Sequence, residues 1–162
     1  MTFSWADLDA LVGGLPSSAY MGYIDALSDD ARALSPAELL NTNGVGLRTP
    51  GLHSWWADKA GADDLSSGIG RDVRAWSHLR GARWCDPNPK RSQVQNTLWG
   101  RIRSMHLGAR HEFSTFRLSL GSTLVSARGE QGINESDLTE WMHQHLRVVA
   151  IAFEDADALG EL

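Results

Sequence analysis

Apolar side chains recur at helical spacing in four parts of this 162-residue chain, and each part predicts a helix. The first predicted helix begins at Ser4 and ends at Gly13. The second begins within 35–38 (Ser-Pro-Ala-Glu), where a serine cap, a proline and an acid suit a first helical turn. The other two begin at Asn96 and Asn134, because asparagine is a favoured helix cap.

Two short runs of large apolar residues, 52–58 and 148–153, predict β-strands. Strand residues alternate between faces, so one of the adjacent indoles of Trp55 and Trp56 should enter the core, and the other should face outward, where it could stack on a base.

The segments between these elements are less regular. The small, acidic run 58–70 predicts a loop, and the stretch 71–95 has no sustained period. The stretch 114–127 suits either a helix or a strand. Together the patterns predict an α/β (α+β) fold, with a helical N-terminal segment at 1–47 and one domain at 48–162.

The net charge of −5 hides a strong segregation along the chain. Residues 1–69 have nine acidic and three basic side chains, and residues 129–162 have eight acidic and one basic. Residues 70–128 have eleven basic side chains, ten of them arginine, against three acidic ones. Arginine binds phosphate bidentately and stacks on bases, so this block fits a nucleic-acid surface. Alternatively, these cations pair with the acidic ends in the folded chain.

Cysteine and histidine placement argues against a metal centre built from the sequence motifs. The single cysteine, Cys85, excludes an internal disulfide and a multi-cysteine metal site. His143 and His145 are two residues apart and lie on different faces of a helix, which is poor ligand geometry. A metal role for His106 and His111, which flank a predicted turn, is likewise disfavoured.

The sequence also predicts where the protein resides. Its N-terminus lacks the basic start and apolar run of a signal peptide, and no stretch reaches the ~20 apolar residues of a membrane span. We therefore expect a cytoplasmic protein with no membrane association.

Four stretches follow one another in a characteristic order. They are 51–58 (GLHSWWAD), 97–108 (TLWGRIRSMHLG), 113–117 (FSTFR) and 138–142 (LTEWM), and the apolar run 147–153 comes after them. This series, within residues 51–162, resembles the GIY-YIG nuclease domain, particularly its small actinobacterial-type members. The resemblance implies a small, mainly antiparallel three-stranded sheet flanked by helices, which binds DNA and hydrolyses a phosphodiester bond with a divalent cation, usually Mg²⁺.

The resemblance also implies which residues would act. The family uses two strand tyrosines, a helix arginine and a cation-binding glutamate. Arg101 matches the arginine, and His53 stands where the first tyrosine is expected. A neutral imidazole can still accept a proton near pH 7, so this replacement preserves part of the chemistry.

Further basic residues would contact the nucleic acid. His106 matches a histidine that often follows the helix arginine, with one residue of extra spacing. Helical geometry places Arg101 beside the apolar stripe and Arg103 toward water. With Arg103, Arg110 and Arg117, His106 predicts a weak, salt-dependent DNA contact.

Two parts of the family pattern are not matched. The second tyrosine, expected between 70 and 90, is absent, because the only tyrosines are Tyr20 and Tyr23. The glutamate would fall just beyond Leu162, so we expect a nuclease domain that is incomplete at its C-terminus and catalytically impaired. Residues 74–83 can be read as an out-of-frame version of the lost strand. The alternative functions are a non-catalytic protein-interaction module with a protein partner, or a fragment of a frameshifted gene.

Overall fold

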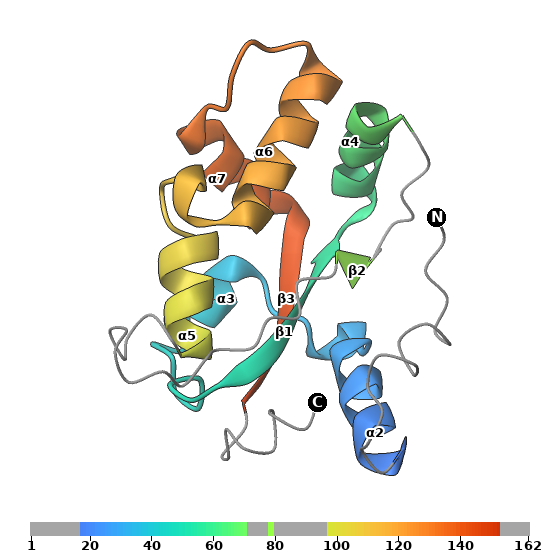
Figure 1. Ribbon diagram of the computed structural model, residues 1–162, viewed down its shortest axis with the longest axis vertical. Helices are drawn as coiled ribbons and strands as arrows, with labels where there is room; N and C mark the ends of the chain where they lie inside the picture. The colour runs from blue at the N-terminus through green and yellow to red at the C-terminus, as the bar shows by residue number, and fades with distance from the viewer. Residues whose placement is uncertain (1–16, 71–77, 80–96, 153–162) are drawn as a thin grey trace.

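The computed structural model describes residues 17–70, 78–79 and 97–152 (Figure 1). The helix predicted from Ser4, the Asn96 cap, Cys85 and the last residue of the predicted strand 148–153 lie outside this described part. The structure contains long helices α2 (Ser17–Leu27), α4 (Lys59–Ile69), α6 (Thr115–Arg128) and α7 (Glu135–His145), and strands β1 (Gly51–Ala57), β2 (His78–Leu79) and β3 (Leu146–Ala152). Shorter helices are η1 (Asp30–Arg32), α3 (Pro36–Asn41), α5 (Leu98–Gly100), η2 (Arg101–His106) and η3 (His111–Phe113).

The sheet is built on β1 and β3, the two runs that the sequence predicts as strands. They pair antiparallel along their whole length, from Gly51 opposite Ala152 to Ala57 opposite Leu146. The two residues of β2 pair antiparallel with Trp55 and Trp56 on the other edge of β1. The mixed α+β class is therefore confirmed, and the predicted full third strand stays a prediction.

Helices cover the sheet on both faces. Trp55 and Ala57 face the larger core, which includes Leu65 of α4, Leu98 of α5 and Met142 of α7. Figure 1 shows α4, α6 and α7 together beyond one end of the two long strands, and α2 near the other.

The opposite face of the sheet has a smaller core of its own. There Trp56 packs with Leu27 of α2 and Val149 of β3, and it is only 8% exposed. This corrects the expectation of an outward indole free to stack on a base. Leu27 of the N-terminal segment covers the face of the sheet that the alternation of strand residues predicts to be exposed.

The run 58–70, predicted as a loop, is the helix α4. The Asp58 side chain accepts a hydrogen bond from the Gly61 amide and caps the helix, and Gly70 ends it in the left-handed conformation. Ala62 and Leu65 are buried on one side. The loop prediction failed because the glycines, serines and aspartates of this run have low helix propensity, whereas packing supplies most of the stability of such a helix.

Three other sequence expectations have clear outcomes. The Ser35 side chain caps α3, and Glu38 completes a capping box with it, as the sequence predicts. The ambiguous stretch 114–127 is helical, and its N-terminal cap is Ser114. The predicted helix at 97–107 begins from a Thr97 cap.

Candidate functional site

β1 carries His53 into the interior of the protein. His53 lies on the same face of the strand as Trp55, two residues later, and is only 1% exposed. Trp55 stacks on Phe116 of α6, with ring centroids 5.0 Å apart and 23° between the planes. His53 is thus fixed to a rigid aromatic layer between the sheet and α6.

Two further site residues come from η2, which is a π-helix. Its wider turn is closed by the Leu107 amide, which donates to the Ile102 carbonyl five residues back at 2.8 Å. In an α-helix, residues five apart would diverge by about 140° around the axis. The wider turn of a π-helix reduces this divergence, so Arg101 and His106 lie toward the same side of η2.

His106 is the neighbour of His53 on that face. The two imidazole centroids are 5.1 Å apart, and His106 is 6% exposed. Its Nδ1 atom lies 2.7 Å from the hydroxyl oxygen of Ser114, and Phe116 packs edge-on against its ring at 5.4 Å. Both candidate histidines are therefore buried and constrained in orientation.

Polar atoms of His53 and Arg101 are buried without hydrogen-bond partners in the described part of the chain. They are Nδ1 and Nε2 of His53 and Nε of Arg101. A buried polar group without a partner typically costs about 1–3 kcal/mol, so such atoms need an explanation. Arg101 as a whole residue is partly exposed, although its Nε atom is buried.

The electrostatic state of His53 follows from the same surroundings. Burial, and secondarily the Arg101 cation, lowers the pKa of His53 to about 4. Its imidazole is therefore neutral at pH 7, and at least one ring nitrogen can accept a hydrogen bond or a proton. The site combines one uncharged acceptor with one permanent cation.

The predicted outer arginines Arg103 and Arg110 are exposed. The Arg103 guanidinium lies 5.9 Å from the centroid of the Trp99 ring, and that of Arg110 lies 5.0 Å from the Phe113 ring. Arg110 also forms a weak surface ion pair with Glu112 at 3.5 Å. Both residues are thus at the surface of the described structure.

Arg117 is placed differently, because its side chain is fully buried. Its guanidinium donates to both Glu135 and the Thr139 hydroxyl, and it contacts the Met142 sulfur. This position is at odds with the expected contact to nucleic acid. His106 is also buried, so it does not offer a surface contact to nucleic acid of the kind that the sequence predicts.

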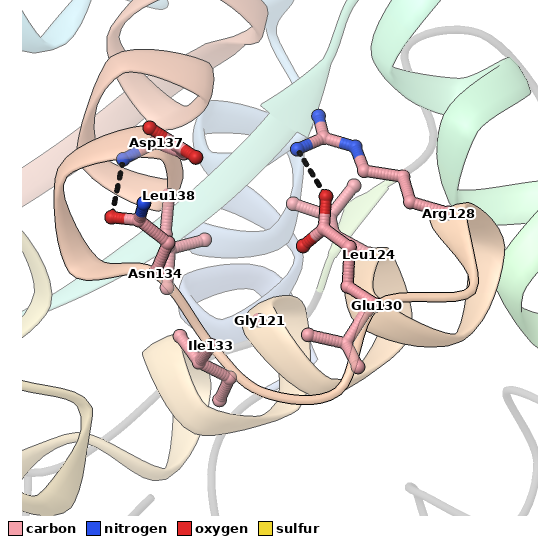
Figure 2. Close-up of a pocket in the computed structure, with 9 residues that line it drawn as sticks. Gly121, Leu124, Arg128, Glu130, Ile133, Asn134, Asp137 and Leu138 are labelled. Carbon is pink, nitrogen blue, oxygen red and sulfur yellow. Dashed lines mark hydrogen bonds and ion pairs between the residues drawn. The ribbon is translucent and has the colours of Figure 1, made fainter.

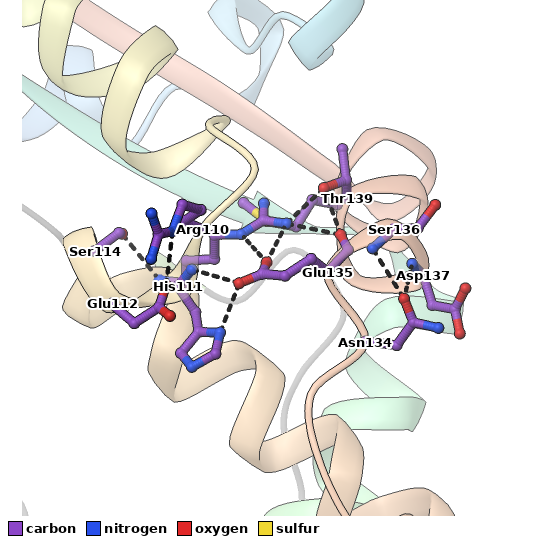
Figure 3. A network of polar contacts seen from close by, with 11 residues as sticks. Arg110, His111, Glu112, Ser114, Asn134, Glu135, Ser136, Asp137 and Thr139 are labelled. Carbon is purple, nitrogen blue, oxygen red and sulfur yellow. Dashed lines mark hydrogen bonds and ion pairs between the residues drawn. The ribbon is translucent and has the colours of Figure 1, made fainter.

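Glu135 is the centre of this second polar network (Figure 3). One carboxylate oxygen accepts the His111 amide and lies 2.6 Å from His111 Nδ1, and the other accepts from Arg117 at 2.9 Å. Burial raises the pKa of Glu135, but the hydrogen bonds from His111 and Arg117 outweigh it, so the net shift is downward. The sequence pattern did not reveal this network, because its members are up to 24 residues apart.

Among the described residues, His111, Glu112 and Glu135 form the one group whose geometry could hold a metal ion. The Glu135 carboxylate already forms an ion pair with Arg117 and accepts a hydrogen bond from the His111 amide. Its oxygens therefore have protein partners without a metal ion. The group includes neither His53 nor Arg101. At those two residues the described donors are imidazole and guanidinium, which do not fit Mg²⁺, since that ion prefers carboxylate and water oxygens.

Hollows on the described surface add little to either site. One, lined by Gly121, Leu124, Ile133 and neighbours, has a volume of about 10 Å³, enough for at most one water molecule (Figure 2). An open depression beside Glu135 is lined by Ala109, Ser136, Thr139, Glu140 and His143. Neither involves His53 or Arg101.

Comparison of the chain with protein-family models, curated proteins and solved structures gives no match. Within the described residues, every helix is too short or too polar to cross a lipid bilayer.

Proposed function

We propose that this protein binds DNA through a phosphate group held at Arg101 and His53. The observation that carries the proposal is the placement of Arg101, a partly exposed residue, near enough to the buried neutral imidazole of His53 to affect its pKa. The ring nitrogens of His53 and Nε of Arg101 lack partners in the described chain. A phosphate oxygen is a strong acceptor for guanidinium N–H groups. A phosphodiester oxygen would therefore accept from Arg101 Nε–H and from the N–H of His53, two donors that the described protein leaves unpaired.

The resemblance to the GIY-YIG nuclease domain supports the same proposal. The β1–β3 pair and the helix carrying Arg101 occur in the order that the resemblance implies. The π-helix η2 accommodates the one residue of extra spacing between Arg101 and His106, because it holds one more residue per hydrogen-bonded turn. We take β2 as part of the third strand of such a sheet, in a cytoplasmic protein.

The proposed chemistry is limited by the groups present. His53 can accept a proton from an attacking water, and Arg101 can stabilise charge that develops on the phosphate. Mg²⁺ does not fit the described donors, and the sequence offers no tyrosine after Tyr23. We therefore propose DNA binding with impaired hydrolysis, in which Arg103 and Arg110 add outer contacts.

An electrophoretic shift with a short DNA duplex at low and moderate salt tests this function. Wild type should shift the duplex at low salt, and its affinity should fall steeply as salt rises. Arg101→Ala should weaken binding about tenfold or more, since it removes a charge-assisted contact. Arg32→Ala is the matched control, because Arg32 is an exposed arginine paired with Asp29 in the N-terminal segment. Equal loss in both variants would contradict a specific role for Arg101.

The alternative is a module that binds a protein partner. It is favoured by two exposed apolar side chains, Phe113 (59%) and Leu118 (43%), near the start of α6. No duplex shift at low salt would reject the proposed DNA binding and favour this alternative.

A further inference from the structure

We infer that the nucleic acid bound at Arg101 and His53 has a hydroxyl group beside its phosphate, as in RNA or at a ribonucleotide in DNA, and that this hydroxyl donates a hydrogen bond to His53. The inference deepens the proposed function and rests on it for the bound phosphate. It concerns which strand the site prefers, whereas the proposed function concerns whether a strand is bound at all.

His53 needs both an acceptor and a donor from whatever binds beside it. Its imidazole is neutral at pH 7, because burial, with Arg101 as the second cause, lowers its pKa to about 4. A neutral imidazole has one N–H group, which donates, and one bare nitrogen, which accepts. Neither nitrogen has a hydrogen-bond partner among the described residues, although the ring centroid of His106 is 5.1 Å away. The site therefore has an unmet acceptor as well as unmet donors.

A phosphodiester alone does not meet this requirement. Its oxygens accept from the N–H of His53 and from Nε–H of Arg101, another buried donor without a partner in the described chain. A phosphodiester at pH 7 has no hydrogen to donate, so the bare nitrogen of His53 stays unsatisfied. His53 is 1% exposed, and bulk water therefore does not reach this nitrogen freely. An unsatisfied buried acceptor is costly, and a ligand with a suitable hydroxyl removes that cost.

The ribose 2′-hydroxyl is the O–H donor that a nucleic acid has on its own backbone. Deoxyribose has only hydrogen at this position, and the N–H groups that pair the bases are engaged within a duplex. A site that bonds a ligand hydroxyl rejects the analogue without it, because the polar group of the site is then left unpaired. The 2′-hydroxyl is also the group by which proteins distinguish RNA from DNA. We therefore assign the preference to His53, while Arg101 holds the phosphate of either strand.

The test compares two duplexes that differ only at the 2′ position of one strand. Both contain the same DNA strand, and its complement has 2′-hydroxyl groups in one duplex and 2′-fluorine in the other. Fluorine keeps the RNA-like sugar shape but has no hydrogen to donate. His53 is buried, so its surroundings must move to admit either strand, and this cost is common to both duplexes. Wild type should bind the hydroxyl duplex about tenfold more tightly than the fluorine duplex at low salt.

Substitution of the histidine tests whether His53 causes the preference. His53→Phe keeps an aromatic ring but removes the acceptor, so this variant should bind the two duplexes equally. His143→Phe is the matched control, because His143 lines the depression beside Glu135 and should leave the wild-type ratio unchanged. Equal affinities in wild type, or a preference that persists in His53→Phe, would overturn the inference and leave the proposed function standing.

A measurement on the wild-type chain covers the case in which His53→Phe does not fold. The ¹⁵N NMR signal of the bare His53 nitrogen should move further on binding the hydroxyl duplex than on binding the fluorine duplex, because only the first donates to it. Equal movement would overturn the inference. Binding of neither duplex at low salt would reject the proposed function, and this inference with it.

Discussion

Gly68 of α4 lies directly against the backbone carbonyl of Thr123 on α6. A Cβ atom added at Gly68 would be 2.1 Å from that oxygen and 2.8 Å from the Thr123 methyl carbon. The carbonyl belongs to a helix backbone and cannot rotate aside. The close packing of α4 on α6, the helix that carries Phe116, therefore depends on a glycine at this position.

We expect Gly68→Ala to lower the free energy of unfolding by about 1–3 kcal/mol, because α4 and α6 must separate to admit the methyl group. Gly22→Ala is the matched control. Gly22 is also within a helix, and a Cβ there would meet nothing within 4 Å. The control should be neutral or stabilising by up to ~1 kcal/mol, the helix-propensity difference. Urea unfolding of both variants measures the contrast, which equal stabilities would refute.

Acid sensitivity should report on His53. Its pKa is about 4 in the folded protein and 6.5 at an ordinary site, so the unfolded chain binds the proton first as pH falls. Stability should therefore decrease from pH 6.5 down to about 4, by ~3 kcal/mol for the full shift. Urea unfolding of wild type and His53→Gln across this range measures the effect. The variant should lose this slope, and parallel curves for the two proteins would show that His53 is not buried in a neutral state.

The buried ion pair predicts an asymmetry between two glutamates. Glu135→Ala leaves the fully buried Arg117 cation without its carboxylate, which should cost on the order of 3 kcal/mol. Glu130→Ala removes only a surface contact with Arg128 at 3.9 Å and should change stability by less than ~0.5 kcal/mol. Thermal or urea unfolding near pH 7 measures both.

The same pair has a pH signature. Because the folded pKa of Glu135 is lowered, its contribution is present above the ordinary value of 4.5 and is lost as pH falls below it. The stability difference between wild type and Glu135→Ala should therefore narrow in acid. A difference that stays constant below pH 4.5 would contradict the assigned ion pair.

Catalysis gives a separate prediction. We expect no useful nicking of supercoiled plasmid with Mg²⁺ or Mn²⁺, because the His53–Arg101 site offers no carboxylate from the described residues to hold the ion. Metal stabilisation of a phosphoryl transition state is commonly worth several kcal/mol, or about a thousandfold in rate. Metal-dependent nicking that disappears in Arg101→Ala would show that the proposed impairment is wrong.

Local chemistry was readable from the sequence wherever a side chain acts on its own neighbourhood. The Ser35–Glu38 capping box is an example. The apolar runs that form β1 and β3 were readable as strands for the same reason, before their pairing is considered. The sequence did not predict the helix α4, because its stability comes from the burial of Leu65 and Ala62 against residues far along the chain. The burial of Trp56 was not predicted for the same reason, since Leu27, which packs against it, belongs to the N-terminal segment.

Only part of the candidate site could be predicted from the sequence. Helical periodicity placed Arg101 beside the core and Arg103 in water, and the structure has Arg101 half-buried and Arg103 exposed. Nothing in the sequence signals that the helix widens to a π-helix, and this widening is what brings His106 round to Arg101. Arg117 looked like a surface cation because its partner Glu135 lies 18 residues later.

The backbone bridge between Leu34 and Val148 has a consequence for the boundary drawn near residue 47. The two residues exchange hydrogen bonds at 3.0 and 2.8 Å on the edge of β3 that faces away from β1. A strand edge with free amides and carbonyls invites pairing with other molecules. Leu34 of the N-terminal segment therefore covers this part of the β3 edge, and we expect a shortened protein beginning at residue 48 to self-associate more than the full chain does.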